Sequence, residues 1–325
     1  MAKSMDDAPQ SQAGLFDGVE MGVGTWQWGD PFVWQYGRGY AAAEVREAFE
    51  AALAAGLSFF DTAEVYGLGR SERFLGEFLH TPGGTQVRVR VATKFATLLW
   101  RPTAGSVVRA LRGSLKRLGL PAVDLYQIHW PVPLIRIETL MSGLADAVEA
   151  GLTRAVGVSN YNLEQTERAH AALAKRGVAL ASNQVHYSLL NRQVERAGLL
   201  EHCAALGFKV IAYSPLEMGV LSGKYTRDRP PSGSRARRYS PHYLGRIQPL
   251  IGRLRQMGEA HPGPDGVARG PAQVSLNWTV CKGTLPIPGA KNAQQVQQNA
   301  GGVGWRLTAD EVAELDELSQ AAQLA

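Results

Sequence analysis

Short apolar segments alternate with longer amphipathic ones along almost the whole of this 325-residue chain, and this alternation constrains its fold more than any other feature. The apolar segments have the length of buried strands, and the amphipathic ones have the periodicity of helices. Strands are predicted at residues 19–24, 58–61, 87–94, 123–129, 153–158, 180–184, 209–213 and 284–287. Helices are predicted at residues 42–55, 71–80, 106–118, 137–150, 163–175, 194–206, 272–281 and 293–299. Eight strands that alternate with helices favour a closed parallel (β/α)8 TIM barrel over a doubly wound sheet.

Two segments depart from this repeat. Residues 214 to about 242 are rich in Pro, Gly, Ser and Arg and are long for a connection, so they predict a functional loop after the seventh strand. Residues 308–319 predict an extra C-terminal helix. Because a barrel of this length is ordinarily one domain, we expect a single domain over residues 1–325, with residues 1–18 as a loose N-terminal segment.

Composition and charge argue against several classes of protein. No run approaches the roughly 20 apolar residues of a membrane helix, so no membrane partner is expected. The net charge is +5, but the basic residues are scattered, which favours a small anionic ligand over a nucleic acid. Cys203 and Cys281 show no metal-ligand spacing and indicate buried free thiols, so we expect no metal site. The absence of a secretory signal in residues 1–18 predicts a cytoplasmic location.

Ionisable residues stand at the ends of three successive predicted strands. Asp61 ends the second strand, Lys94 the third and His129 the fourth, and Tyr66 follows in the loop after Asp61. Each alone has an ordinary structural explanation, such as a turn cap, a packing aromatic or a core histidine. Because active sites of such barrels lie at the carboxyl ends of the strands, we expect the four side chains to form one site.

These four residue types suit proton donation to a substrate. The ordinary pKa of a tyrosine is about 10, and an ammonium ~4 Å away would lower it by at most roughly 3 units. Lys94 is therefore expected to make Tyr66 a usable general acid, and Asp61 to keep the lysine charged. His129 would orient a carbonyl oxygen from the other side.

Two glycine turns resemble the dinucleotide-binding fingerprint but do not satisfy it. The Gly-X-Gly turns at 22–24 and 67–69 are followed by Gln27 and Glu72, where the fingerprint needs a third glycine. A dinucleotide, if one binds, must therefore be held by another part of the fold.

A series of short motifs resembles the aldo/keto reductase family, from about Gly22 to the end of the chain. The motifs, in the family's order, are Gly24-Thr25-Trp26, Phe60-Asp61-Thr62-Ala63, Tyr66-Gly67, Ser71-Glu72, Ala92-Thr93-Lys94, Gln127-Ile128-His129-Trp130, Gly157-Val158-Ser159-Asn160, Asn183-Gln184-Val185, Ala212-Tyr213-Ser214-Pro215-Leu216 and Ile287-Pro288-Gly289. The resemblance implies a (β/α)8 barrel that reduces an aldehyde or ketone with NADPH. It also implies that the catalytic residues are Asp61, Tyr66, Lys94 and His129, with Tyr66 protonating the nascent alkoxide.

The same resemblance implies the cofactor-binding residues. Ser159, Asn160 and Gln184 match the positions that hold the nicotinamide carboxamide, and Tyr213 matches the aromatic that stacks on the ring. The remaining matches, which include the pyrophosphate loop and the segment around the 2′-phosphate, are Trp26, Ser214, Leu216, Gly219, Leu221, Ser222, Lys224, Arg235, Gly289, Lys291, Gln295, Gln298 and Asn299.

The charges in this set bear on the choice between NADP and NAD. The cations of Lys224, Arg235 and Lys291 favour NADP, because they suit the extra phosphate. Gln295 and Gln298 depart from the family, where many members carry an arginine and most a glutamate, so the strength of the NADPH preference does not follow from the sequence.

Two further features concern the substrate and the branch of the family. Residues 277–289 and 304–308 look most like plant and algal aldo/keto reductases near pyridoxal reductases, which makes the plastid stroma an alternative location. Aromatic residues near the catalytic end are expected to line the substrate pocket, with pyridoxal as one candidate. They are Trp26, Trp28, Phe32, Trp34, Tyr36, Trp100 and Trp130.

Two alternatives to a reductase stay open at this point. The branch of the family with a long loop includes potassium-channel β subunits, so an NADPH-binding regulatory or partner subunit is possible, although their extended N-terminal segment is not seen here. A barrel that acts on phosphorylated metabolites without a nucleotide would explain the cations but leave Tyr66 and Lys94 without a role. We expect a monomer or a weak homo-oligomer.

Overall fold

Eight parallel strands form one sheet in the order β1 to β8 in the computed structural model, which describes residues 14–81 and 87–323. The strands are β1 Val23–Gly24, β2 Phe59–Asp61, β3 Arg90–Phe95, β4 Val123–Ile128, β5 Thr153–Ser159, β6 Leu180–His186, β7 Lys209–Tyr213 and β8 Leu285–Ile287. The two edges meet, because Gly24 forms a parallel bridge with Gly289, and the Gly22 amide donates to the carbonyl of Pro286 at 3.0 Å. The predicted (β/α)8 TIM barrel is confirmed.

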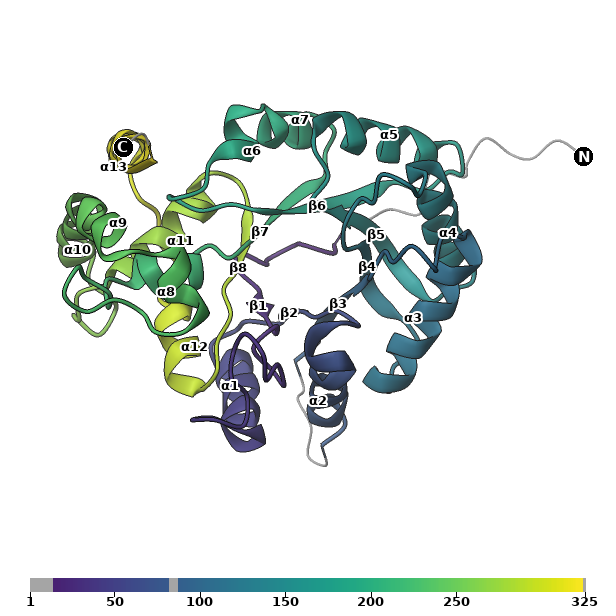
Figure 1. Ribbon diagram of the computed structural model, residues 1–325, viewed down its shortest axis with the longest axis horizontal. Helices are drawn as coiled ribbons and strands as arrows, with labels where there is room; N and C mark the ends of the chain where they lie inside the picture. The colour runs from purple at the N-terminus through teal and green to yellow at the C-terminus, as the bar shows by residue number, and fades with distance from the viewer. Residues whose placement is uncertain (1–13, 82–86, 324–325) are drawn as a thin grey trace, which may run out of the picture.

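Helices surround this barrel (Figure 1). They are α1 Ala42–Ala54, α2 Arg70–Leu79, α3 Ala104–Leu118, α4 Ile137–Glu149, α5 Leu163–Ala174, α6 Gln193–Arg196, α7 Leu199–Ala205, α8 Ser234–Arg238, α9 Pro241–Arg246, α10 Gln248–Ala260, α11 Pro271–Cys281, α12 Ala293–Ala300 and α13 Ala309–Gln323. Two short 3-10 helices, η1 Tyr66–Gly69 and η2 Glu217–Ser222, follow β2 and β7. The predicted extra C-terminal helix is present as α13.

Apolar periodicity explains how helices and strands pack. Helix α3 buries Val107, Leu111, Leu115 and Leu118, which lie on one face at helical spacing. A second apolar cluster fills the barrel interior, with one or two side chains from each strand between β2 and β8: Phe59, Ala92, Leu125, Ala155, Ala181, Ile211, Leu285 and Ile287. Phe16 packs against this cluster from the N-terminal segment. The ionisable residues Asp61, Lys94 and His129 lie instead at the carboxyl ends of their strands.

One expectation about a helix needs correction. The predicted helix 194–206 is divided into α6 and α7, because Gly198 adopts a φ of 73°, which a helix does not accommodate. The long connection predicted after the seventh strand is confirmed, and residues 214–242 contain the short helices η2 and α8 and the start of α9. Helix α10, which the sequence analysis did not assign, follows directly and buries Leu250, Ile251, Leu254 and Met257.

The remaining expectations concern the cysteines, the N-terminal segment, membrane helices and the number of domains. Both cysteines are free, Cys203 buried and Cys281 partly buried. Of the loose segment expected at 1–18, residues 1–13 lie outside the described part of the chain. None of the helices in the described ranges is long and apolar enough to cross a bilayer. The single domain over residues 1–325 stays a prediction.

Candidate active site

The barrel brings the four predicted catalytic side chains together. Asp61 is the last residue of β2, Lys94 lies near the end of β3, and His129 directly follows β4. The Nζ of Lys94 forms a very short ion pair with Asp61 Oδ1 and lies 3.3 Å from the hydroxyl of Tyr66. The ring of Tyr66 is in edge contact with the imidazole of His129, with centroids 5.7 Å apart. The four side chains therefore form one contact network.

Asp61 has more partners than the sequence analysis expected. Its Oδ2 accepts hydrogen bonds from the side-chain amides of Gln184, at 2.8 Å, and Gln127, at 3.3 Å. These residues lie on β6 and β4, and in such barrels alternate strands contribute the side chains of one interior layer. With Lys94 on the other oxygen, Asp61 is satisfied on both sides, and this removes most of the cost of burying a carboxylate.

The pKa of Tyr66 corrects one expectation. Burial raises this pKa well above its ordinary value, and the negative charge of Asp61 raises it further. The prediction that Lys94 lowers it is wrong for the free protein, because desolvation of the phenolate is the dominant effect. Burial also lowers the pKa of Lys94, although Asp61 beside it favours the charged form. Tyr66 is therefore a fully protonated phenol that contacts a buried lysine.

His129 is held as a neutral imidazole. Burial lowers its pKa well below the ordinary value, and Lys94 adds to this shift. Its backbone is fixed on both sides, because its amide donates to Phe95 O at 3.0 Å and its carbonyl accepts from Asn160 Nδ2 at 3.0 Å. The neutral ring can donate one N–H and has no charge that would compete with Lys94.

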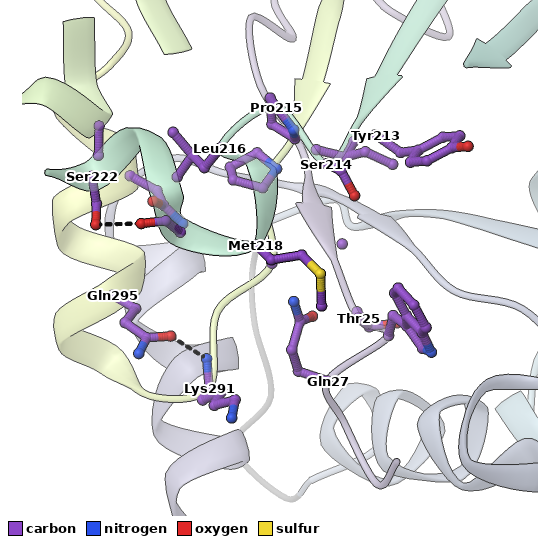
Figure 2. A pocket seen from close by; sticks show the side chains of 18 of the residues that line it. Thr25, Gln27, Tyr213, Ser214, Pro215, Leu216, Met218, Ser222, Lys291 and Gln295 are labelled. Atoms are coloured by element: carbon purple, nitrogen blue, oxygen red, sulfur yellow. Dashed lines mark hydrogen bonds between the residues drawn. The ribbon is translucent and has the colours of Figure 1, made fainter. Parts of the chain in front are cut away.

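A cavity of about 1120 Å³ opens beside this network and runs along the ends of β1, β7 and β8 (Figure 2). Its volume exceeds the roughly 300–1000 Å³ of ordinary small-molecule sites, so it has room for a dinucleotide together with a substrate. The predicted residues that line it are Trp26, Asp61, Tyr66, His129, Ser159, Asn160, Gln184, Tyr213, Ser214, Leu216, Gly219, Ser222, Lys224, Arg235, Gly289, Lys291, Gln295, Gln298 and Asn299. Lys94 and Leu221 are fully buried behind its wall.

The residues predicted for the nicotinamide lie together beside Tyr66. The hydroxyl of Tyr213 donates to Asn160 Oδ1 at 2.9 Å, and Ser159 Oγ donates to the carbonyl of Gln184 at 2.8 Å. The side-chain amide of Gln184 also faces Asp61, so it links the catalytic network to this part of the cavity. Asn160 adopts a φ of 63°, a conformation that asparagine accepts more readily than most residues.

Three cations gather in the part of the cavity that is lined by the segment after β7 and by α12. Lys224 and Arg235 come from the segment after β7 and Lys291 from the connection just before α12, and all three line the cavity. Burial lowers the pKa of Lys291 to about 8, and the charges of Arg235 and Lys224 add to the shift. Within the described residues, Lys291 Nζ donates its hydrogen bond to a neutral group, the Trp34 carbonyl, at 3.0 Å. Such a cluster favours an anionic ligand.

Two glycines allow side chains to pack closely at the wall of the cavity. A Cβ at Gly289 would lie 1.8 Å from Gln27 Nε2, so only glycine allows Gln27 to pack at this wall. Gln27 Oε1 is buried and has no hydrogen-bond partner in the described chain. Gly219 has a φ of 92°, and a Cβ added at this position would lie 3.1 Å from the end of the Lys224 side chain. The three cations fit the phosphates of a cofactor such as NADP, whereas the unpaired acceptor Gln27 Oε1 suits an N–H or O–H donor of such a cofactor.

The predicted aromatic pocket is confirmed only in part. Trp26, Trp34 and Trp130 line the cavity, and Trp26 stacks on the ring of Tyr66 with centroids 6.2 Å apart. The other four do not line it: Trp28 is a core residue, Tyr36 packs on Tyr40 and Phe74, and Phe32 and Trp100 are exposed. A tryptophan in a loop can anchor the loop as well as face a ligand, and the sequence does not distinguish the two.

Several lining residues were not predicted. The ends of the Gln27 and Met218 side chains point toward one another in Figure 2. Tyr225 supports Arg235, whose Nη1 donates to the tyrosine hydroxyl at 3.1 Å. Residues of the connection before α11, around Gly270, also line the wall. No local pattern marks them, because the long segment after β7 brings them together.

A comparison with known protein families matches residues 20–320 to the aldo/keto reductase family. The chain belongs to this family. The match begins just before β1 and ends within α13, so it covers the whole barrel. The chain is therefore an oxidoreductase by family.

Individual relatives agree with this assignment. The chain is 41% identical over 307 residues to a chloroplastic pyridoxal reductase of Arabidopsis thaliana, covering 91% of this chain and 82% of the relative. It is 29% identical over 294 residues to a putative voltage-gated potassium channel subunit beta of Schizosaccharomyces pombe, covering 86% and 85%. A crystal structure of an aldo-keto reductase from Klebsiella pneumoniae in complex with NADPH has a TM-score of 0.70 and 28% identity, covering 92% and 90%. The predicted resemblance to plant pyridoxal reductases is confirmed.

Proposed function

We propose that this protein reduces an aldehyde or ketone to the alcohol with NADPH, and that Tyr66 is the general acid. The observation that carries the proposal is the position of Lys94 Nζ, which contacts both Asp61 and the hydroxyl of Tyr66 at the wall of the large cavity. The cation cluster supports NADPH, since the 2′-phosphate is the group that needs such charge. The NADPH complex of the Klebsiella pneumoniae relative supports the same cofactor.

Each of the four side chains has a separate role in proton transfer. NADPH would supply a hydride to the carbonyl carbon. Tyr66 donates its phenolic proton to the carbonyl oxygen, and the phenolate left behind is stabilised by Lys94 at 3.3 Å. A proton from solvent then restores the phenol. Asp61 keeps Lys94 charged and in place, and the neutral ring of His129 orients the oxygen by donating an N–H.

The residues expected to hold the cofactor follow from their places in the cavity. Ser159, Asn160 and Gln184 would bind the carboxamide of the nicotinamide beside Tyr66, with Tyr213 against the ring. Lys224, Arg235 and Lys291 would bind the phosphates. The polar residues of α12, Gln295, Gln298 and Asn299, would contact the adenosine end.

The walls near Tyr66 suit a flat or apolar carbonyl compound. Trp26, Trp34 and Trp130 supply aromatic surface there, and Trp130 is 40% exposed, so it can cover a substrate from the solvent side. Pyridoxal is our first candidate, because the relative with 41% identity is named for it.

A second candidate is an NADPH-binding partner subunit with little turnover. The observation that favours it is the channel subunit name of the Schizosaccharomyces pombe relative. We rank it below the reductase, because identity to that relative is 29% against 41% for the pyridoxal reductase. A barrel that acts on phosphorylated metabolites without a nucleotide ranks last, since it leaves the contact between Lys94 and Tyr66 without a role.

The test is consumption of NADPH, followed by its near-ultraviolet absorbance, with a panel of aldehydes that includes pyridoxal and 4-nitrobenzaldehyde and with NADH in parallel. We expect turnover that is faster with NADPH. Tight NADPH binding without turnover across the panel would favour the partner subunit. Failure to bind NADPH would contradict both. Location in the cytoplasm or plastid stroma, and a monomeric or weakly oligomeric state, stay predictions.

A further inference from the structure

Glu217 is a buried carboxylate in the cofactor segment for which the mechanism above has no use. It begins η2, is only 3% exposed and does not line the cavity. Its Oε1 accepts hydrogen bonds from His186 Nε2 and, at 2.8 Å, from Ser188 Oγ. Its Oε2 accepts from the hydroxyl of Tyr239 at 2.8 Å and lies 3.4 Å from a guanidinium nitrogen of Arg238. A carboxylate with four donors joins elements that are distant along the chain.

One of these elements is the strap, which we define as residues 223–239. Tyr239 ends the strap directly after α8, and its amide donates to the carbonyl of Arg235 at 3.0 Å. Arg235 lines the cavity and is one of the three cations described above. Glu217 therefore holds the end of the helix that carries a phosphate-binding candidate.

The other element is the end of β6. The ring of His186 lies nearly parallel to that of Tyr213, with centroids 5.3 Å apart and an interplanar angle of 15°. Asn191 Nδ2 donates to His186 Nδ1 at 2.7 Å, so the ring carries its proton on Nε2 and donates it to Glu217. Through His186, Glu217 supports the ring of Tyr213, which would stack on the nicotinamide.

The backbone around Glu217 is unusual as well. Ser214, Glu217 and Met218 have φ values of 51°, 48° and 54°, a left-handed region that residues other than glycine rarely adopt. Such conformations persist where the surroundings over-determine them, and the four donors to Glu217 provide this constraint. Burial alone would raise the pKa of Glu217, but the donors from His186, Ser188 and Tyr239 more than offset it, and the pKa lies below its ordinary value. The group is a carboxylate at neutral pH.

We propose that Glu217 is a positioning residue for the cofactor: it fastens the strap, so that Arg235 stays at the cleft, and it supports Tyr213 through His186. The proposal rests on the NADPH assignment made above. Glu217 itself acts through Tyr239 and His186 and does not touch the cofactor. Loosening this contact should let NADPH leave faster, because Arg235 loses its fixed position.

The test is the rate of NADPH dissociation, measured by stopped-flow recovery of intrinsic protein fluorescence. The gentlest variant is Tyr239→Phe, which removes only the hydroxyl that donates to Glu217. Tyr243→Phe is the matched control, because Tyr243 packs against Tyr239 and its hydroxyl makes no hydrogen bond to Glu217 in the described structure. We expect dissociation about tenfold faster for Tyr239→Phe and within about twofold of wild type for the control, as for loss of one hydrogen bond to a charged group.

A second measurement separates positioning from a general structural effect. In an Arg235→Ala background, Tyr239→Phe should change NADPH dissociation by less than about twofold, since Arg235 is the cation on α8 whose position the contact between Tyr239 and Glu217 fixes. Fully additive effects would overturn the proposal, as would a Tyr239→Phe variant that matches the control. Glu217→Gln should give a larger effect, and if it does not fold, the Tyr239 variants still decide. A wild-type protein that does not bind NADPH would contradict the proposed function itself, whereas normal wild-type binding with an unaffected Tyr239→Phe contradicts only this inference.

Discussion

The catalytic network and the cation cluster occupy the same cavity but are built in opposite ways. Asp61, Lys94 and His129 stand at the ends of three neighbouring strands, are at most 6% exposed, and include an ion pair that balances its own charge. Lys224, Arg235 and Lys291 come from loops and short helices, and none of them forms an ion pair with a carboxylate of the described chain. The first group contains cation and carboxylate in contact, whereas in the second group burial, and then repulsion by Arg235 and Lys224, lowers the pKa of Lys291. Under the proposed function, this comparison assigns the chemistry to the barrel and the cofactor selectivity to the segments added to it.

Tyr66→Phe should have the largest effect on the catalytic side. Loss of the proton donor is expected to lower carbonyl reduction by about 10²–10⁴-fold, while the dissociation constant for NADPH changes less than about twofold. Steady-state kinetics and fluorescence titration of the same variant check this. Tyr225→Phe, which loses the hydroxyl that accepts from Arg235, should show the reverse pattern. Equal turnover in Tyr66→Phe and wild type would contradict the proposed mechanism.

Lys94→Met tests whether the catalytic network is also a stability element. Removing the cation leaves Asp61 buried without its charge partner, so we expect a loss of about 3–5 kcal/mol in the free energy of unfolding. The surface pair of Arg176 and Glu149 is partly exposed, and Arg176→Met should cost less than about 1 kcal/mol. Urea unfolding of both variants provides the measurement. Similar losses for the two variants would show that the buried ion pair contributes no more to the free energy of unfolding than a surface ion pair does.

Arg235→Ala tests the cation side. Because only NADPH carries the 2′-phosphate, we expect its affinity to fall about 10–100-fold and that of NADH to change less than about threefold. Arg237→Ala is the matched control, since Arg237 lies on the same helix α8 and does not line the cavity. Fluorescence titration with both cofactors gives the answer. An equal loss for NADPH and NADH would show that Arg235 binds the pyrophosphate or maintains the shape of the loop, and does not bind the 2′-phosphate.

The pKa of Lys291 predicts a smaller, pH-dependent effect. This pKa is about 8 in the free protein, and a bound phosphate would raise it, so the favourable charge is present below pH 8 and is lost as pH rises through it. NADPH affinity should be about twofold weaker at pH 8 and about tenfold weaker at pH 9 than at pH 6.5. NADH affinity should stay level, and Lys291→Met should remove the dependence. Parallel pH profiles for the two cofactors would show that Lys291 does not meet the 2′-phosphate.

The sequence predicts that Asp61, Lys94 and His129 lie close together, because the carboxyl ends of all strands lie at the same end of a parallel barrel. A residue placed at the end of a strand is therefore placed in space, and Asp61, Lys94 and His129 needed only the strand boundaries. The same reasoning did not reach Gln127, whose contact with Asp61 crosses the barrel interior. It also gave the wrong direction for the pKa of Tyr66, because the depth of burial is not visible in a sequence.

The segment after β7 was predicted less well for a physical reason. Its prolines, glycines and arginines indicate a loop, yet tertiary contacts fold α8 and α9 within it, and α10 buries an apolar face against the rest of the chain. Family resemblance placed Lys224 and Arg235 at the cavity, but it contained nothing about Glu217. The partners of Glu217 are 29 to 31 residues before it and 21 to 22 after it, and no local pattern predicts such contacts.

The most direct test of the account is to follow deuterium from NADPH that is labelled at the transferred position of nicotinamide C4. The labelled cofactor is mixed with the protein and the fastest aldehyde of the panel, and the alcohol is analysed by mass spectrometry. The account predicts one deuterium on the former carbonyl carbon in wild type, and almost no labelled alcohol from Tyr66→Phe even though the variant binds NADPH. Bound NADPH that transfers no deuterium to any aldehyde, or undiminished transfer in Tyr66→Phe, would contradict it.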